Sequence, residues 1–180
     1  MAEAGRRDAR DDLFLEDDEN EDTQANKYLF FRIADESYGI GIRHILEIIE
    51  LQKISQVPDM PAYVKGVIDL RGKVIPVVDL RLRFGLSERP YDDRTCIVVA
   101  DIVRTTLGFI VDTVEEVIEI PENQVEEAPR FRTHSGKDRY ISGMGKVGED
   151  VKILLDVETL VRDEDVQAMA AAEGAATGSA

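Results

Sequence analysis

The chain has 180 residues, 43% of them hydrophobic, which is enough to bury the core of one domain or of two small subdomains. Its formal net charge of -15 is concentrated at the ends, so that residues 27–162 carry only -4. Nucleic acid and anionic lipid both require clustered Lys and Arg, and no apolar run approaches the roughly 18 residues of a membrane span, so we expect neither a nucleic-acid partner nor direct membrane insertion.

The two ends of the chain differ from the body in composition. Residues 1–26 hold ten acidic and three basic side chains, and residues 163–180 hold four acidic and no basic ones. We expect the first to be a disordered acidic extension and the second a flexible tail, around a folded domain at 27–162. The N-terminus has no apolar secretion segment and Cys96 is the only cysteine, which predicts a cytoplasmic protein.

Short β-type runs begin at Lys27. KYLFFRIA and YGIGI, separated by a turn at ADES, predict a β-hairpin. RHILEIIE, residues 43–50, places its apolar residues on one helical face and is predicted to form one or two helical turns packed on a sheet.

A second hairpin follows a loop that contains Pro58 and Pro61. GVIDL and KVIPVVDL are predicted strands joined around Arg71 and Gly72. Because Pro76 cannot donate to a β-ladder, its strand is expected to be an edge strand, or bulged, and therefore open to a docking partner.

The second half repeats this pattern. TCIVVADIV, TLGFIVDTV, EEVIEIP, RYISGMGKV and VKILLDV are predicted strands, and DVETLVRDED is predicted to end the fold as a helix. So many short strands indicate a mainly β protein of sandwich or small-barrel type. A boundary at residues 87–94 would divide it into two barrels that share a core.

No enzymatic or metal-binding pattern emerges. Residues 143–148 match G-x-G-x-x-G, but a strand follows instead of the helix that a nucleotide site needs. His44 and His134 belong to no ligand spacing, and Asp69 and Asp79 fit turn hydrogen bonding better than a catalytic pair. We therefore predict no catalytic residue, no metal site and no cofactor.

Arg71 is a candidate for a specific ion pair. It lies between apolar strand residues and Gly72, so a partly desolvated guanidinium would need a carboxylate, and Glu47 is the obvious one. A solvated Arg at a hairpin tip is the alternative that composition favours.

The central motif VPDMPAYVKGVIDLRGKVIPVVDLRLRFG, with YGI and ILEII before it and PRF, YISGMG and ILLDV after it, resembles the bacterial chemotaxis coupling family CheW. The resemblance covers about residues 27–162. It implies two five-stranded SH3-like β-barrel subdomains around a common hydrophobic core. It also implies a non-catalytic adaptor that joins the cytoplasmic tips of chemoreceptors to the regulatory domain of the histidine kinase CheA, recruited from the cytoplasm to receptor arrays.

The resemblance also implies binding residues. The receptor tip is expected in the groove between the barrels, and the family's Arg–Glu ion pair falls on Arg71 and Glu47. The matching receptor-binding positions are Ile45, Glu47, Gly66, Arg71, Ile97 and Gly108. The kinase-binding positions are Arg130 and Phe131, with Val74, Ile75, Pro76 and Val77 on the predicted strand.

Two other functions remain open. CheW-like modules also serve other receptor–kinase pathways such as pilus motility. A small-barrel domain that binds oligonucleotide or sugar is a different class, and the lack of Trp and of a basic groove argues against it.

Overall fold

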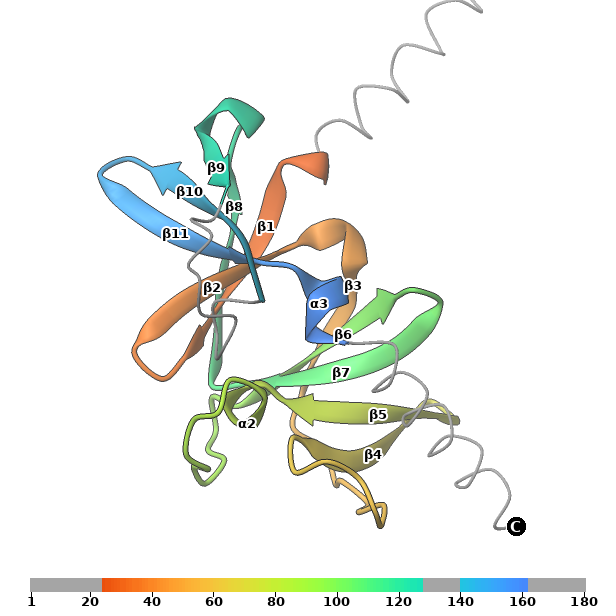
Figure 1. Ribbon diagram of the computed structural model, residues 1–180. Coiled ribbons are helices and arrows are strands. Elements are labelled where there is room, and N and C mark those ends of the chain that lie inside the picture. The colour runs from red at the N-terminus through yellow and green to blue at the C-terminus, as the bar shows by residue number, and fades with distance from the viewer. Residues whose placement is uncertain (1–23, 128–139, 162–180) are drawn as a thin grey trace, which may run out of the picture.

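Two β-sheets make up the protein in a computed structural model that describes residues 24–127 and 140–161 (Figure 1). The six-stranded sheet has the order β8-β1-β2-β11-β10-β9, and the five-stranded sheet has the order β3-β6-β7-β5-β4. The strands of the first are β1 (Lys27–Ile33), β2 (Glu36–Gly41), β8 (Thr113–Glu119), β9 (Val125–Glu127), β10 (Ile141–Val147) and β11 (Asp150–Leu155). Those of the second are β3 (Ile45–Glu50), β4 (Val64–Leu70), β5 (Lys73–Asp79), β6 (Cys96–Ile102) and β7 (Thr105–Val111). The short helices are η1 (Ile42–His44), α2 (Leu80–Arg83), η2 (Glu122–Gln124) and α3 (Val157–Leu160).

The strands of the five-stranded sheet, β3–β7, are inserted in the chain between β2 and β8 of the six-stranded one, and the two sheets pack against each other (Figure 1). The predicted boundary at residues 87–94 is therefore wrong, because this loop connects α2 to β6 within a single subdomain. The loop is fastened to that subdomain where the Tyr91 hydroxyl donates to Asp79 at 2.8 Å. Polar and Pro-containing residues mark a loop, but only the pairing of distant strands shows which sheet each end joins.

Both faces of the central strands are buried, which explains their continuous apolar sequences. On β6, Ile97 and Val99 point into the five-stranded subdomain, whereas Val98 and Ala100 join a larger cluster with residues of both sheets. On β1, Phe30 belongs to a third cluster, inside the six-stranded subdomain. The prediction of two subdomains that share a hydrophobic core is confirmed.

The segment 43–50 corrects the predicted helical turns. Helix η1 ends at His44, and Ile45–Glu50 is the strand β3, paired antiparallel with β6. Four isoleucine and leucine residues at 45, 46, 48 and 49 fit a helical face and a bulged strand equally well. The segment forms a strand because it pairs with β6, which lies some fifty residues later in the chain.

Strand β5 corrects the prediction of an open edge at Pro76. It lies between β4 and β7, and its parallel ladder with β7 runs over Val77–Asp79. Pro76 is paired with Val67, whose N–H and C=O both bond to Ser55 and therefore point away from β5. In an antiparallel pair the two residues point the same way relative to the ladder, so the Pro76 nitrogen points away from β4. The ladder with β7 begins only at Val77, so the missing N–H of Pro76 removes no hydrogen bond from either ladder.

The hairpins and the final helix agree with the sequence. β1 pairs with β2, β4 with β5, and β10 with β11. Arg71 and Gly72 both have positive φ in the β4–β5 turn, at 53° and 86°. α3 lies between the two subdomains (Figure 1), and its Val157 and Leu160 are part of the shared core.

Candidate functional site: a docking surface on the five-stranded subdomain

All six predicted receptor-binding residues lie in the five-stranded subdomain. Two are on its edge strand β3, one is on β4, one is in the β4–β5 turn, and one each is on β6 and β7. None comes from the six-stranded subdomain. The predicted binding of the receptor tip in the groove between the subdomains stays a prediction, and the six residues belong to only one side of such a groove.

The Glu47 and Arg71 side chains meet at the surface. Arg71 Nη2 donates to Glu47 Oε2 at 2.8 Å, which links the edge strand β3 to the β4–β5 turn. The Arg71 side chain is 77% exposed and that of Glu47 25%, so the expected desolvation of the guanidinium is wrong. An ion pair this exposed adds little to stability, and its value lies in fixing two surface segments relative to each other.

Three of the six residues are interior. Ile97 is fully buried. A Cβ on Gly108 would lie 2.6 Å from Ile97 Cγ2 and 3.0 Å from Val77 Cγ1, and a Cβ on Gly66 would collide with the Ser55 carbonyl oxygen. None of the three presents a side chain to solvent, and their role in receptor binding stays a prediction. The sequence shows that they are small or apolar but not which side of the barrel wall they face.

Enlarging Gly108 is expected to destabilise the fold. Gly108→Val forces the added methyl groups against Ile97 and Val77, which should lower the free energy of unfolding by about 1–3 kcal/mol. Chemical denaturation measures this. Gly41→Ala is the matched control, because a Cβ there meets nothing closer than His44 Cδ2 at 3.8 Å. Equal stability of the Gly108→Val protein and the wild type would contradict the packing described here.

The predicted kinase-binding strand is also largely interior. Ile75 and Val77 are fully buried, Pro76 is buried, and Val74 is half-buried. β5 is an internal strand, and the role of these four residues in kinase binding stays a prediction. Arg130 and Phe131 lie outside the described residues, and their role stays a prediction.

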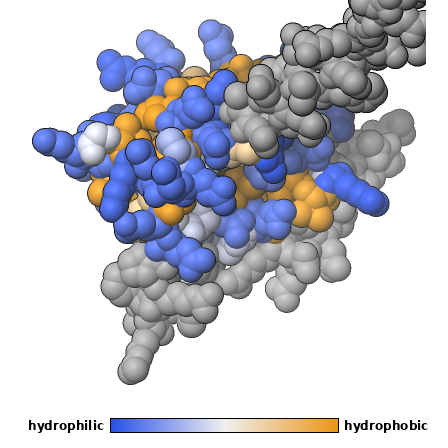
Figure 2. Space-filling view, turned by 90° about the horizontal axis from the view of Figure 1, so that it is seen from above, coloured by the Kyte–Doolittle hydropathy of each residue, from blue (hydrophilic) through white to orange (hydrophobic). Residues whose placement is uncertain are grey.

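The sequence analysis missed two exposed apolar side chains on β3. Leu46 is 59% exposed and Ile48 44%, beside the half-buried Glu47. Reading residues 45–50 as a strand would have found them, since burial alternates residue by residue along it. On the face seen in Figure 2, apolar patches likewise interrupt a mainly hydrophilic surface.

The described residues hold no cluster of three or more His, Cys, Asp or Glu side chains that could bind a metal ion. Within residues 24–127 and 140–161, no helix has the length and apolar character to cross a membrane.

Comparison with known proteins decides the family. Residues 27–165 match the CheW-like domain. The chain belongs to the CheW-like family. It is 32% identical to the chemotaxis protein CheW of Klebsiella aerogenes over 145 residues, covering 81% of this chain and 87% of that one. The CheW of Helicobacter pylori is 33% identical over 138 residues, covering 77% and 82%.

A solved structure shows the same fold. The scaffolding protein TtCheW of Thermoanaerobacter tengcongensis superposes with a TM-score of 0.71 at 32% identity, over 78% of this chain and 95% of that one. The two sheets are thus the two SH3-like subdomains of a CheW-like protein. The five-stranded expectation holds for one subdomain, and the other has a sixth strand, the three-residue β9.

The two Asp-Leu-Arg repeats of this CheW-like chain serve turns, as the sequence indicated. Asp69 Oδ1 accepts from the Gly72 N–H at 2.8 Å in the β4–β5 turn. Asp79 Oδ1 accepts from the Arg81 N–H at 2.9 Å and caps α2, and its other oxygen accepts from Tyr91. Asp79 is buried with its oxygens bonded, which accounts for it structurally and leaves no reason to assign it a catalytic role.

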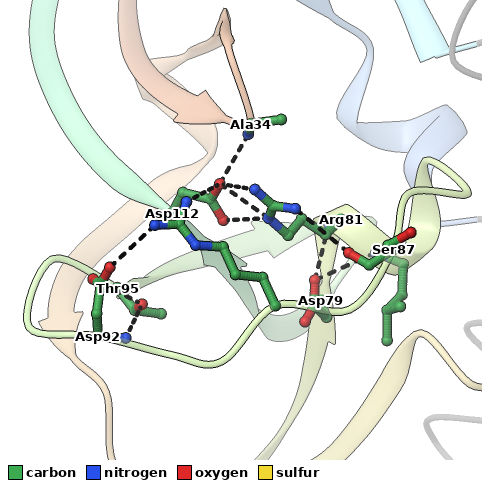
Figure 3. A network of polar contacts seen from close by, with 9 residues as sticks. Ala34, Asp79, Arg81, Ser87, Asp92, Thr95 and Asp112 are labelled. Carbon is green, nitrogen blue, oxygen red and sulfur yellow. Dashed lines mark hydrogen bonds and ion pairs between the residues drawn. The ribbon is translucent and has the colours of Figure 1, made fainter.

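Arg81 of the second repeat joins the two subdomains (Figure 3). Its Nε and Nη2 donate to Asp112 at 2.8–3.0 Å, and Asp112 also accepts from the Ala34 N–H in the β1–β2 turn at 2.8 Å. Burial alone would raise the pKa of Asp112, but the hydrogen bonds from Arg81 and Ala34 outweigh burial and lower it. The hydrogen bonds between Arg81 and Asp112 raise the pKa of Arg81. The Arg81–Asp112 ion pair and the hydrogen bond from Ala34 together connect the two subdomains.

Proposed function

We propose that this protein is a non-catalytic chemotaxis adaptor that joins the cytoplasmic tips of chemoreceptors to the regulatory domain of the histidine kinase CheA. The observation that carries the proposal is the juxtaposition, on one edge of the five-stranded subdomain, of the exposed Glu47–Arg71 ion pair and the exposed Leu46 and Ile48. Exposed apolar residues beside a fixed polar pair are typical of a protein-docking surface.

The named relatives support this assignment. They are chemotaxis proteins, and the solved structure is a scaffolding protein. An adaptor acts by binding two partners at once, so that each bound partner raises the effective concentration of the other. For the kinase contact we propose Phe131 with Arg130, and we propose that the protein is recruited from the cytoplasm to receptor arrays at the membrane.

The proposed function is tested by measuring kinase autophosphorylation in receptor-containing membranes. We expect the rate to rise several-fold when the purified protein is added with the organism's own CheA and receptor, and to return to the basal level when the receptor ligand is added. The same mixture without receptor is the control. A rate that does not respond to the protein, at concentrations that saturate binding to the kinase, would contradict the proposed function.

A further inference from the structure

Residues 11–22 have a composition unlike that of the rest of the chain. They read DDLFLEDDENED, with eight acidic and no basic side chains around the apolar triplet Leu13, Phe14 and Leu15. Such a triplet flanked by carboxylates is complementary to an apolar surface with basic neighbours. These twelve residues, called the acidic segment below, have no part in the proposed function.

The acidic segment joins the fold next to helix η1. Asp22 lies within about 18 Å of Lys27, the start of β1, because five residues of extended chain span no more. Tyr28 of β1 pairs with Gly41, and Arg43 of η1 follows two residues later. Since the twelve residues themselves extend to about 40 Å, η1 and the turns beside it are within their reach.

Charge directs the acidic segment toward η1 and away from β8, the other neighbour of β1. Glu119 of β8 lies opposite Lys27, and Glu116 is exposed on the same strand. η1 has no acidic residue in its first turn and carries Arg43 and His44 in its last. The carboxylates of the segment are therefore repelled on the β8 side and attracted on the η1 side.

A second basic residue lies at the same end of the five-stranded sheet. β3 begins directly after η1, and its Ile45 pairs with Ala100 near the end of β6. The two-residue β6–β7 turn, Val103 and Arg104, follows three residues later. Arg43 and Arg104 are both exposed, and neither makes an ion pair within residues 24–127 and 140–161, so both charges are open to a ligand.

The β6–β7 turn holds its exposed side chains in a costly backbone conformation. Val103 has a φ of 48° and Arg104 a φ of 63°. A two-residue hairpin turn with positive φ at both positions favours Asn-Gly, and a β-branched residue is poorly suited to it. Val103 is nevertheless 65% exposed, more than any other large hydrophobic side chain of the described residues. The strain points to a contact that these side chains make and the turn itself does not need.

Arg43, Val103 and Arg104, called the turn surface below, lie in a locally basic region. The charged side chains at this end of the sheet are four cations and three carboxylates, namely Arg43, Arg71, Lys73, Arg104, Glu47, Asp69 and Asp101. Glu47 is already paired with Arg71 at 2.8 Å, and Asp69 accepts from the Gly72 N–H. Residues 27–162 carry -4 in total, so this excess of cations is local.

The other cluster of arginines suits the acidic segment less well. Arg32, Arg89 and Arg94 line a pocket that also contains Asp92, Asp93 and Asp112, so that cations and carboxylates are equal in number. The pocket includes Ala34, which follows the last residue of β1. It is therefore separated from the start of β1 by the length of a seven-residue strand, about 20 Å.

We propose that the acidic segment binds the turn surface within the same molecule. Its central apolar triplet contacts Val103, and the carboxylates on either side pair with Arg43 and Arg104. Bound there, the segment lies beside the Glu47–Arg71 pair and competes with a partner that docks on that side. The competition rests on the proposed function, whereas the intramolecular contact does not.

The contact is tested by comparing amide NMR spectra of the full-length wild type with the full-length triple variant Leu13→Ser, Phe14→Ser, Leu15→Ser. We expect the amide signals of Arg43, Val103 and Arg104 to move by more than a line width. In 1 M NaCl, where the Debye length is about 3 Å, the same signals of the wild type should move toward their positions in the variant. The matched control is Glu3→Ser with Asp8→Ser, which removes two carboxylates outside the segment and should leave all three signals in place.

Three results would overturn the contact. The first is a triple variant whose signals from residues 27–161 all coincide with those of the wild type. The second is a set of changes at Arg32, Arg89 and Arg94 instead, which would place the segment in the junction pocket. The third is a difference that disappears on dilution, because the segment would then bind a second copy of the chain.

The competition is measured as affinity for a soluble fragment of a chemoreceptor tip. A tethered segment at an effective concentration of about 1 mM, binding with a dissociation constant of about 0.1–1 mM, lowers partner affinity roughly two- to tenfold, and the triple variant should recover this factor. Unchanged or weaker binding by the variant, with the signal changes present, would overturn the competition and leave the contact standing. A wild-type protein and a variant that both bind no receptor tip would instead overturn the proposed function.

Discussion

Reversing the charge of Arg71 is expected to abolish receptor coupling without unfolding the protein. In Arg71→Glu two carboxylates replace an ion pair of 2.8 Å, so Glu47 and with it β3 lose their link to the β4–β5 turn. Because the Arg71 side chain is 77% exposed, the melting temperature should stay within a few degrees of wild type. Receptor-dependent kinase activation should fall at least tenfold, while direct kinase binding persists.

A charge swap separates two roles of Arg71. The double variant Glu47→Arg with Arg71→Glu restores an ion pair in which the positive and negative side chains have exchanged places. If the pair acts by fixing β3, as we propose, the swap should recover most of the receptor coupling. Coupling that stays lost in the swapped protein would mean that the guanidinium itself contacts the receptor. A melting temperature that collapses in Arg71→Glu alone would make the residue structural and contradict its assignment to the docking surface.

The hairpins could be predicted from the sequence because their signals are local. Arg71-Gly72 separates two β-branched runs, and Gly72 supplies a positive φ of 86° at no steric cost. The final helix was likewise predictable, since Asp156 precedes Val157 and Leu160 at helical spacing and caps α3 through the Glu158 N–H.

The strand β3 and the subdomain boundary could not be predicted because they depend on distant partners. Residues 45–50 become a strand through pairing with β6, and β3–β7 become one subdomain because β5 pairs in parallel with β7 across the intervening loop. Neither contact leaves a pattern within the segment that it determines.

The sequence indicates the segments of the candidate site but not which of their side chains reach the surface. In the structure Glu47 and Arg71 meet at the edge of the five-stranded sheet. For an apolar residue such as Ile97, the sequence does not distinguish a side chain that faces a partner from one that faces the barrel interior. Only the packing of the folded chain shows that Ile97 is enclosed and that Leu46 is 59% exposed.

Among the variants considered, the one that removes the Asp112 carboxylate is expected to lose the most stability. In Asp112→Asn the Arg81 guanidinium, whose side chain is 14% exposed, keeps its charge at the subdomain junction but loses the carboxylate that it is hydrogen-bonded to. A buried pair broken on one side typically costs 3–5 kcal/mol, and partial exposure reduces this to about 2–3 kcal/mol. Such a loss lowers the melting temperature of a chain of this size by roughly 4–12 °C.

The matched control is Glu115→Gln, which makes the same carboxylate-to-amide change in the exposed Arg32–Glu115 pair between β1 and β8. Arg32 is 51% exposed there, so the change should cost under about 1 kcal/mol. Equal losses in the two variants would mean that the Arg81–Asp112 pair has no special role at the junction.

The effect of Asp112 should also depend on pH in a defined direction. The pKa of Asp112 is lowered in the folded protein, and an unfolded Asp titrates near about 3.9. Its stabilising contribution is therefore complete above that value and is lost as the pH falls through the lower folded-state pKa. The difference in free energy of unfolding between wild type and Asp112→Asn, measured by urea denaturation, should be constant from pH 5 to 8 and should shrink below about pH 4. A difference that grows on acidification would require that protonated Asp112 be the stabilising form, which the donors from Arg81 and Ala34 exclude.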